Sequence, residues 1–134
     1  MTLDQERRSV ILVVEDVEET RDAIEQLLVA TGYIVSTARD EAEAVFKARV
    51  QPPDLILMSL GIDAVHIGEM GRRIRANSWL TDRVPIVAFC VATLAEGTEA
   101  EVGYNIYLTR PDNFDQLRRL LSRLLEGSRG PAEL

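Results

Sequence analysis

The fold of this chain is constrained most by two uninterrupted apolar runs, Val10–Val14 and Leu55–Met58. Each run is too short to cross a membrane, and neither alternates with polar residues as a half-exposed strand does. Four of the five residues in the first run are β-branched, which favours an extended backbone. Such runs are typical of strands that are buried on both faces of a parallel sheet.

Amphipathic segments separate these runs from three further predicted strands. The five predicted strands are Val10–Val14, Tyr33–Ala38, Leu55–Met58, Pro85–Cys90 and Ile106–Leu108. Their alternation with helices predicts an α/β fold, a doubly wound (βα)5 sandwich of three layers with a five-stranded parallel sheet. We expect the domain to span residues 9–126, between tails of residues 1–8 and 127–134.

Apolar residues at helical spacing mark four of the predicted helices. Their stripes are Ile24, Leu27, Leu28 and Thr31; Ala42, Val45 and Phe46; Ile67, Met70, Gly71 and Ile74; and Leu117, Leu120, Leu121 and Leu124. Two of these helices follow a capping-box pattern, Asp40 with Glu43 and Asn113 with Gln116.

The helix ends and the fifth helix rest on weaker signals. Gly32 and Gly127 are expected to end the first and the last helix. A weak helix is predicted over Thr93–Val102, although Gly97 lies in its interior. The three arginines within Arg72–Arg75 lie off the apolar stripe of their helix, so we expect them to face solvent.

Charge and composition exclude several classes of function. The net charge is −7, so nonspecific binding to nucleic acid is not expected, because phosphate contacts need a basic surface. An anionic membrane surface would repel the chain for the same reason. One cysteine and one histidine cannot form a usual zinc site or an internal disulfide. We expect a cytoplasmic protein without a signal peptide or a membrane span.

Polar residues follow the predicted strands at their carboxyl ends. In a doubly wound sheet, the functional crevice lies beyond these ends. The residues found there are Glu15, Asp16, Ser59, Cys90, Thr109, Arg110 and Pro111. We therefore expect these side chains to line one crevice.

Three stretches of the chain carry a family resemblance. The chain resembles response-regulator receiver domains in ILVVEDVEETRDAI, at their opening, in PDLILMSLG, at their third strand, and in YLTRP, at their fifth strand. The resemblance covers residues 9–125. It implies a CheY-like, flavodoxin-like fold, a role in two-component (phosphorelay) signalling, and a bacterial source.

The same resemblance implies a phosphorylation site that is changed at three positions. Receivers accept phosphate on an aspartate after the third strand, where this chain has Ser59. Cys90 stands at the position of a Ser or Thr, and Arg110 at the position of a lysine. Serine is a neutral alcohol that needs an adjacent base to act as a nucleophile, and no histidine is placed for that role. We therefore expect a degenerate receiver without catalytic residues, and not an enzyme.

A metal site and a switch position are implied as well. The Mg²⁺ ligands of receivers are matched by the acidic pair Glu15 and Asp16, and the backbone carbonyl of Gly61 is a further candidate. With the third carboxylate replaced, we expect weak Mg²⁺ binding at best and no other cofactor. Arg110 is expected to form an ion pair with one acid of the pair in place of the metal. Tyr107 matches the aromatic position that reports phosphorylation, and we expect a fixed interface residue there.

The sequence favours one function and leaves two alternatives open. The favoured function is a signalling module that works without phosphorylation, through protein partners such as a histidine kinase or another response regulator. A homodimer through residues 93–125 is one form of this hypothesis, since that segment carries both acids and bases. The alternatives are a phosphotransfer receiver with another acceptor, such as Asp63, and a small-ligand-binding domain that uses the degenerate crevice.

Overall fold

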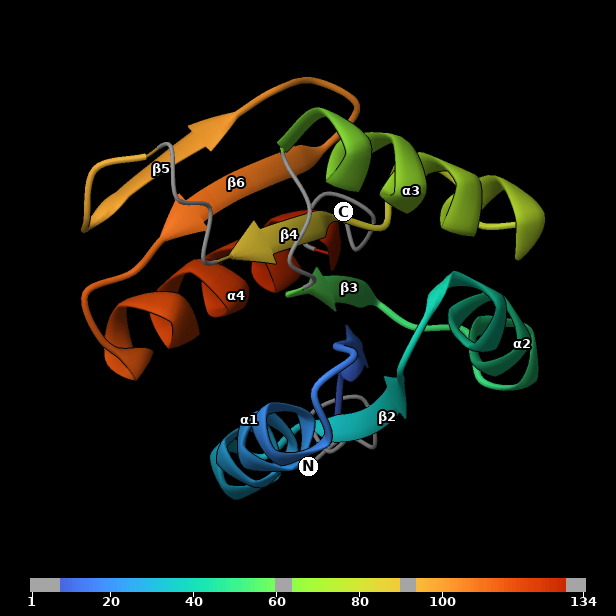
Figure 1. Ribbon diagram of the computed structural model, residues 1–134, viewed down its shortest axis with the longest axis horizontal. Helices are drawn as coiled ribbons and strands as arrows, with labels where there is room; N and C mark the ends of the chain where they lie inside the picture. Colours follow the sequence, from blue (N-terminus) through green and yellow to red (C-terminus); the bar gives the residue numbers. More distant parts are fainter. Residues whose placement is uncertain (1–7, 60–63, 90–93, 130–134) are drawn as a thin grey trace.

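The computed structural model describes residues 8–59, 64–89 and 94–129, which form one six-stranded sheet and four helices (Figure 1). In chain order the elements are β1 (Val10–Val14), α1 (Glu18–Thr31), β2 (Ile34–Ala38), α2 (Glu41–Val50), β3 (Leu55–Met58), α3 (Ala64–Asn77), β4 (Ile86–Phe89), β5 (Thr98–Glu101), β6 (Ile106–Arg110) and α4 (Phe114–Arg129). The strand order is β2-β1-β3-β4-β6-β5, and only the β5–β6 pair is antiparallel. The predicted doubly wound α/β fold is confirmed.

The two apolar runs form neighbouring central strands, as predicted. β3 lies between β1 and β4, and all four of its side chains are fully buried. β1 lies between β2 and β3, and four of its five residues are buried. Since both faces of these strands are covered, neither strand has a position that favours a polar side chain.

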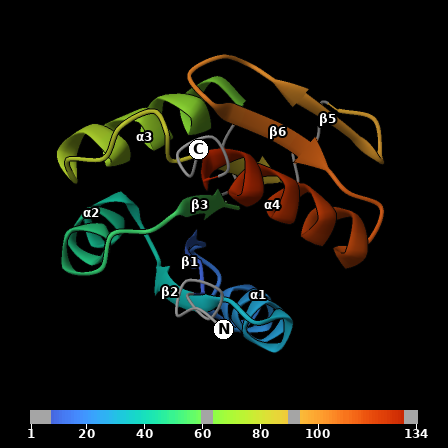
Figure 2. The same cartoon turned by 180° about the vertical axis from the view of Figure 1, so that it is seen from behind.

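Helices cover both faces of the sheet and divide the core into two clusters (Figures 1 and 2). On one face, α2 and α3 contribute Ala44, Ala48, Ile67 and Ile74. On the other face, α1 and α4 contribute Ile24, Leu28, Leu117, Leu120, Leu121 and Leu125. The structure therefore has the three layers that the sequence predicts.

The predicted helix over Thr93–Val102 is wrong, and so is the strictly parallel five-stranded sheet. Residues Thr98–Glu101 form β5 at the edge of the sheet, antiparallel to β6. Of the four residues of β5, only Ala100 is partly buried, an alternation that suits an edge strand. Gly97, with φ of 86°, has a left-handed backbone that cannot continue a right-handed helix, and its N–H donates to the Arg110 carbonyl at 2.6 Å.

A tight turn joins β5 to β6. Gly103, Tyr104 and Asn105 all have positive φ, of 96°, 57° and 59°. The Ile106 amide closes the turn on the Gly103 carbonyl at 3.0 Å. Positive φ at both central residues is characteristic of a type I′ turn, whose twist matches that of an antiparallel pair. This local geometry explains why the segment forms a hairpin.

Two further details of the helices differ from the sequence prediction. α4 does not end at Gly127 but continues to Arg129, because one helical glycine costs only about 1 kcal/mol against the burial of its leucines. In α2, the predicted stripe is correct only for Val45, which packs against the core: Ala44 and Ala48 are buried, whereas Phe46 is 63% exposed. Small side chains let a helix lie close to the sheet, so the alanines form the inner face of α2.

α1 and α3 end in the same hydrogen-bonded motif with different residues. At the end of α1, Gly32 has φ of 113°, and the Tyr33 amide donates to the Leu28 carbonyl at 3.2 Å. At the end of α3, Trp79 has φ of 63°, and the Leu80 amide donates to the carbonyl five residues earlier at 2.8 Å. Both ends are Schellman motifs, in which glycine is the usual left-handed residue. A residue with a Cβ costs about 1–2 kcal/mol in this conformation.

Two glycines in α3 provide a matched test of its packing. A Cβ at Gly71 would lie 2.8 Å from Cδ1 and 3.1 Å from Cγ2 of buried Ile86, so Gly71→Ala is expected to destabilise the fold by about 1–3 kcal/mol. A Cβ at Gly68 would meet no atom within 4 Å, so Gly68→Ala should stabilise the helix by about 0.5–1 kcal/mol. Urea unfolding of both variants measures the difference. Equal effects of the two substitutions would contradict the close contact of α3 with β4.

Candidate functional site

Five parallel strands end at one edge of the sheet, and the described crevice residues lie at or just past the ends of β1, β3 and β6. Val14 pairs with Met58, so the next residues, Glu15 and Ser59, are neighbours across β1 and β3. The Ser59 amide donates to the Val14 carbonyl at 2.9 Å, and Ser59 is half-buried. The crevice rule therefore placed Glu15 and Ser59 together correctly, although their chemical role does not follow from adjacency alone.

Glu15 is held firmly between β1 and α1. Only 3% of the residue is exposed, and its Oε2 accepts a hydrogen bond from the Val17 amide at 3.0 Å. Its own amide donates to the Ala38 carbonyl at 2.9 Å, and its carbonyl accepts from Nη1 of Arg21 at 2.9 Å. The carboxylate thus accepts a hydrogen bond at the start of α1, where negative charge is favourable. Asp16, the second acid of the pair, is exposed.

Arg110 does not form the predicted ion pair. In the part of the chain that the structure describes, no salt bridge joins Arg110 to Glu15 or Asp16. Its side chain is exposed, and Nη1 donates to the Leu94 carbonyl at 3.1 Å. The antiparallel β5 causes this difference, because it brings the segment before Gly97 beside the end of β6.

Tyr107 is the second residue of β6 and lies on the face covered by α1 and α4. The residue is half-buried and packs against the core cluster of that face. Burial raises the pKa of its hydroxyl; Glu101 and Glu99 act in the same direction, and Arg123 opposes them. Glu101 is the direct partner of Tyr107 in the register of β5 with β6. The ring therefore packs against the core cluster formed by α1 and α4, with Glu101 beside it on β5.

Three residues of the sequence prediction lie outside the described residues: Gly61, Asp63 and Cys90. Of the residues that the structure does describe, no group of three His, Cys, Asp or Glu side chains is close enough to hold a metal. Glu15 and Asp16 supply two carboxylates at the crevice, and one oxygen of Glu15 already accepts a hydrogen bond. This donor set allows weak Mg²⁺ binding, because Mg²⁺ keeps several water ligands and needs only one or two protein carboxylates.

A groove between α1 and α4 was not foreseen from the sequence. It measures ≈ 430 Å³ and opens beside the carboxyl end of β4. Its lining consists of Ile24, Leu27, Phe89, Arg110, Pro111, Asn113, Phe114 and Leu117. Leu27 is 46% exposed at its rim although it belongs to the apolar stripe of α1. Leu27 is thus an apolar residue on the stripe of α1 that stays outside the core, and this is the local feature that marks the groove.

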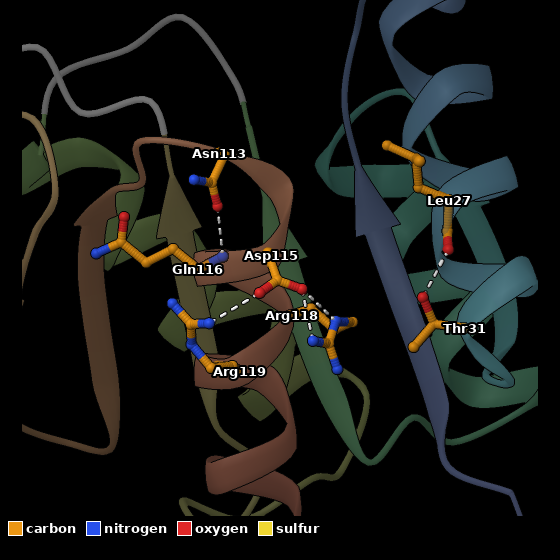
Figure 3. A network of polar contacts seen from close by, with 7 residues as sticks. All are labelled: Leu27, Thr31, Asn113, Asp115, Gln116, Arg118 and Arg119. Atoms are coloured by element: carbon orange, nitrogen blue, oxygen red, sulfur yellow. Dashed lines mark hydrogen bonds and ion pairs between the residues drawn. The ribbon is translucent and has the colours of Figure 1, made fainter.

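A polar network orders α4 beside the groove (Figure 3). Asn113 Oδ1 accepts a hydrogen bond from the Gln116 amide at 2.9 Å, which confirms the cap at Asn113, while Gln116 Oε1 accepts from the Asp112 amide at 2.7 Å instead of from Asn113. Asp115 Oδ1 accepts from Arg118 at 2.5 Å, and its Oδ2 accepts from Arg119 at 2.8 Å. Arg118 lowers the pKa of the Asp115 carboxyl, chiefly through this hydrogen bond. The acids and bases at the start of α4 are therefore paired within the helix.

One finding concerns membranes. Across residues 8–59, 64–89 and 94–129, none of the helices has the length and apolar character needed for a membrane span. The cytoplasmic location stays a prediction.

Two curated relatives of this chain are named as regulatory proteins. The KdpE transcriptional regulatory protein of Staphylococcus aureus is 32% identical over 123 residues, which cover 87% of this chain and 51% of KdpE. The DivK polar-differentiation response regulator of Brucella anthropi is 28% identical over 109 residues, 75% of this chain and 83% of DivK. The chain thus spans about half the length of KdpE and most of DivK.

A solved structure and a family model agree with these relatives. The receiver domain of the sensor histidine kinase PA1611 from Pseudomonas aeruginosa is 32% identical, with a TM-score of 0.62 over 89% of this chain and 98% of that one. That structure has a magnesium ion coordinated in its active site cleft. The family model of the response regulator receiver domain matches residues 11–122. With this match over most of the chain and its sheet order, the chain belongs to the response regulator receiver domain family of two-component signalling and has the CheY-like, flavodoxin-like fold.

Proposed function

We propose that this chain is a pseudo-receiver, a signalling module that works by binding a protein partner and not by accepting a phosphoryl group. The observation that carries the proposal is Ser59, a neutral hydroxyl at the end of β3 next to the buried Glu15. A receiver uses a carboxylate at that point as both nucleophile and metal ligand. The serine supplies neither function, so the proposed signal does not depend on phosphorylation.

The surroundings of Ser59 support this proposal. Arg110, at the lysine position of the family, donates to the Leu94 carbonyl instead of pairing with the acids of the crevice. Glu15 is engaged at the start of α1, which leaves exposed Asp16 as the main ligand for an ion. We therefore expect weak Mg²⁺ binding at most.

The groove between α1 and α4 is the docking surface that we propose for the partner. Receiver domains interact with histidine kinases and with other response regulators. An apolar side chain of such a partner would bury Leu27, Phe89 and Phe114, while an acidic group could pair with Arg110 at the rim. A homodimer through residues 93–125 is the weaker form of the proposal. The acids and bases that favoured it, such as Glu99 with Arg123, are already paired within the chain.

A small-molecule ligand is the second candidate function. The observation in its favour is the same groove, whose ≈ 430 Å³ and largely apolar lining suit a small amphipathic compound. Ligand bound to the folded state raises the melting temperature, so a compound screen by thermal shift tests this function. Phosphotransfer with Asp63 as acceptor is the remaining alternative, and the next experiment addresses it.

Intact mass spectrometry after incubation with Mg²⁺ and a small-molecule phosphodonor tests the main proposal. We expect no phosphoryl adduct on the wild type, because Ser59 replaces the carboxylate nucleophile of a receiver with a neutral alcohol. Ser59→Ala is the matched control, and Ser59→Asp restores the carboxylate. An adduct on Ser59→Asp alone would show that the rest of the crevice still supports phosphoryl transfer. An adduct on the wild type would refute the proposal, and its loss in Asp63→Asn would identify Asp63 as the acceptor.

A further inference from the structure

The outer face of α2 is apolar although it faces solvent. Phe46 and Val50 are 63% and 69% exposed, and Ala42 is exposed as well. These residues are four apart in the sequence, so they form one stripe along the helix. The helix buries Ala44 and Ala48 and packs Val45 against the core, while it leaves the larger Phe46 and Val50 in water. An ordinary surface helix turns its large apolar side chains inward.

Trp79 extends this stripe from the end of α3, and Trp79 is 76% exposed. The guanidinium carbon of Arg49 lies 4.5 Å from the centre of the indole ring. Nε and Nη2 of the same arginine donate to the Asn77 carbonyl at 2.9 and 2.6 Å. Arg49 therefore ties the indole at the end of α3 to α2, and the two helices lie side by side (Figure 1). The α2 patch is defined as Ala42, Phe46, Val50 and Trp79.

The backbone of Trp79 indicates that its side chain serves something other than folding. Its left-handed conformation, at φ of 63°, is the one that Gly32 adopts at the end of α1. Glycine would form the same motif without steric strain. A large apolar side chain that is both exposed and held in an unfavourable backbone conformation contributes little to stability, and such outliers concentrate at functional positions.

We propose that the α2 patch is the interface between two copies of this chain, which pair across a two-fold axis with their α2 helices antiparallel. In this arrangement Phe46 lies at the axis and meets its own copy. Ala42 of one copy lies opposite Val50 of the other, so that a small side chain leaves room for a larger one. A two-fold axis needs a surface that is complementary to itself, and this stripe has that property.

The charges of α2 select a second copy in the antiparallel direction. The first turn of the helix carries Glu41 and Glu43, and the last turn carries Lys47 and Arg49. Glu41 pairs with Arg73 of its own chain, so the charges that remain for a second copy are Glu43, Lys47 and Arg49. Antiparallel pairing brings the acidic start of each helix to the basic end of the other and also opposes the two helix dipoles. Parallel pairing would place like charges side by side. A hollow of ≈ 550 Å³ beside the stripe, lined by Glu41, Ala42, Val45, Arg49 and Asn77, has room for an aromatic side chain of the second copy.

The size of the patch predicts a weak dimer. A helix of 10 residues is about 15 Å long, so the contact falls in the class of interfaces below about 1,200 Å² that is typical of transient complexes. The net charge of −7 opposes self-association, but ions at 0.15 M screen charges beyond about 8 Å. The dimer should therefore form at high protein concentration and physiological salt.

Sedimentation equilibrium over a wide concentration range tests the dimer. We expect reversible dimerisation of the wild type, and a dissociation constant at least about tenfold higher for Phe46→Glu, which places two like charges at the axis. Val65→Glu is the matched control, since Val65 is 68% exposed on α3 outside the α2 patch, and it should dimerise like the wild type. A wild type that stays monomeric, or a Phe46→Glu variant that dimerises normally, would overturn the proposal.

Two further variants test the role of Trp79 and the antiparallel geometry. Trp79→Gly should weaken the dimer yet melt at or above the wild-type temperature, because glycine relieves the left-handed backbone. A lower melting temperature would assign Trp79 a structural role and remove it from the interface. With Cys90 replaced by alanine, Phe46→Cys should form a disulfide between two copies, whereas Val65→Cys should not. Absence of the link at residue 46 would exclude the two-fold axis proposed. Neither result depends on the phosphorylation of the crevice.

Discussion

Replacement of Leu28 by alanine is expected to lower the free energy of unfolding by about 3–4 kcal/mol. Leu28 lies on the inner face of α1, has no exposed surface, and belongs to the core cluster shared with α4. Removing its side chain loses the burial of three carbons and leaves a cavity that close-packed neighbours fill only in part. Urea unfolding followed by circular dichroism measures the change, at an unaltered slope with denaturant if the native state is otherwise intact.

Leu27→Ala is the matched control in the same helix. Leu27 is 46% exposed at the rim of the groove between α1 and α4, so its truncation should cost less than about 1 kcal/mol. The same substitution should weaken docking of a partner, because Leu27 is available to another protein and not to the core. Equal destabilisation by the two substitutions would show that α1 does not pack as described. A stable Leu27→Ala protein with unchanged partner affinity would remove the groove from the proposed function.

The parts of the fold that were predicted correctly depend on signals that are local in the sequence. β1 and β3 follow from apolar runs that exclude any exposed face. The start of α2 follows from Asp40, whose Oδ1 accepts a hydrogen bond from the Glu43 amide at 2.8 Å. Such signals need no knowledge of distant partners, because the residues that produce them are within a few positions of one another.

The errors arose where distant residues decide the structure. β5 is stabilised by its pairing with β6 and by the turn at Gly103, and neither is visible in the composition of the segment. The stripe predicted for α2 from helical spacing included Ala42 and Phe46, which are exposed, and omitted Ala44 and Ala48, which are buried. The sheet instead accepts the alanines, since a close approach of helix to strand needs small side chains. Which face of a short helix packs inward thus depends on how closely the helix must approach the sheet.

In the candidate site, too, features set by local sequence were predicted correctly, and features set by distant contacts were not. Adjacency of Glu15 and Ser59 followed from the rule that parallel strands end at one edge. The path of the Arg110 side chain did not, because it depends on β5, which was assigned as a helix. The groove could not be derived either, since Phe89 and Phe114 meet only in the folded chain. Position along a strand is predictable from the sequence, whereas the direction of an exposed side chain depends on contacts made elsewhere.

Arg75 was expected to face solvent with its neighbours, but only 2% of the residue is exposed. Its Nη1 donates to the Val84 carbonyl at 2.9 Å, and its Nη2 lies 3.4 Å from Oδ1 of Asp82. Burial lowers the pKa of the guanidinium, and Asp82 acts in the opposite direction. The side chain thus links α3 to the segment that enters β4. An arginine can reach such a position because its long apolar stem packs while its head finds acceptors.

Arg75→Ala is therefore expected to destabilise the fold by about 2–4 kcal/mol, through loss of a charge-assisted hydrogen bond and through the cavity left by the stem. Arg72→Ala, at an exposed position of the same helix, should change stability by less than about 1 kcal/mol. Arg75→Met separates the two causes, since methionine fills the volume without donating to Val84. If Arg75→Met recovers most of the stability, packing of the stem dominates. If it is as unstable as Arg75→Ala, the hydrogen bond to Val84 is decisive, and if both variants match the wild type, Arg75 is not buried as the structure has it.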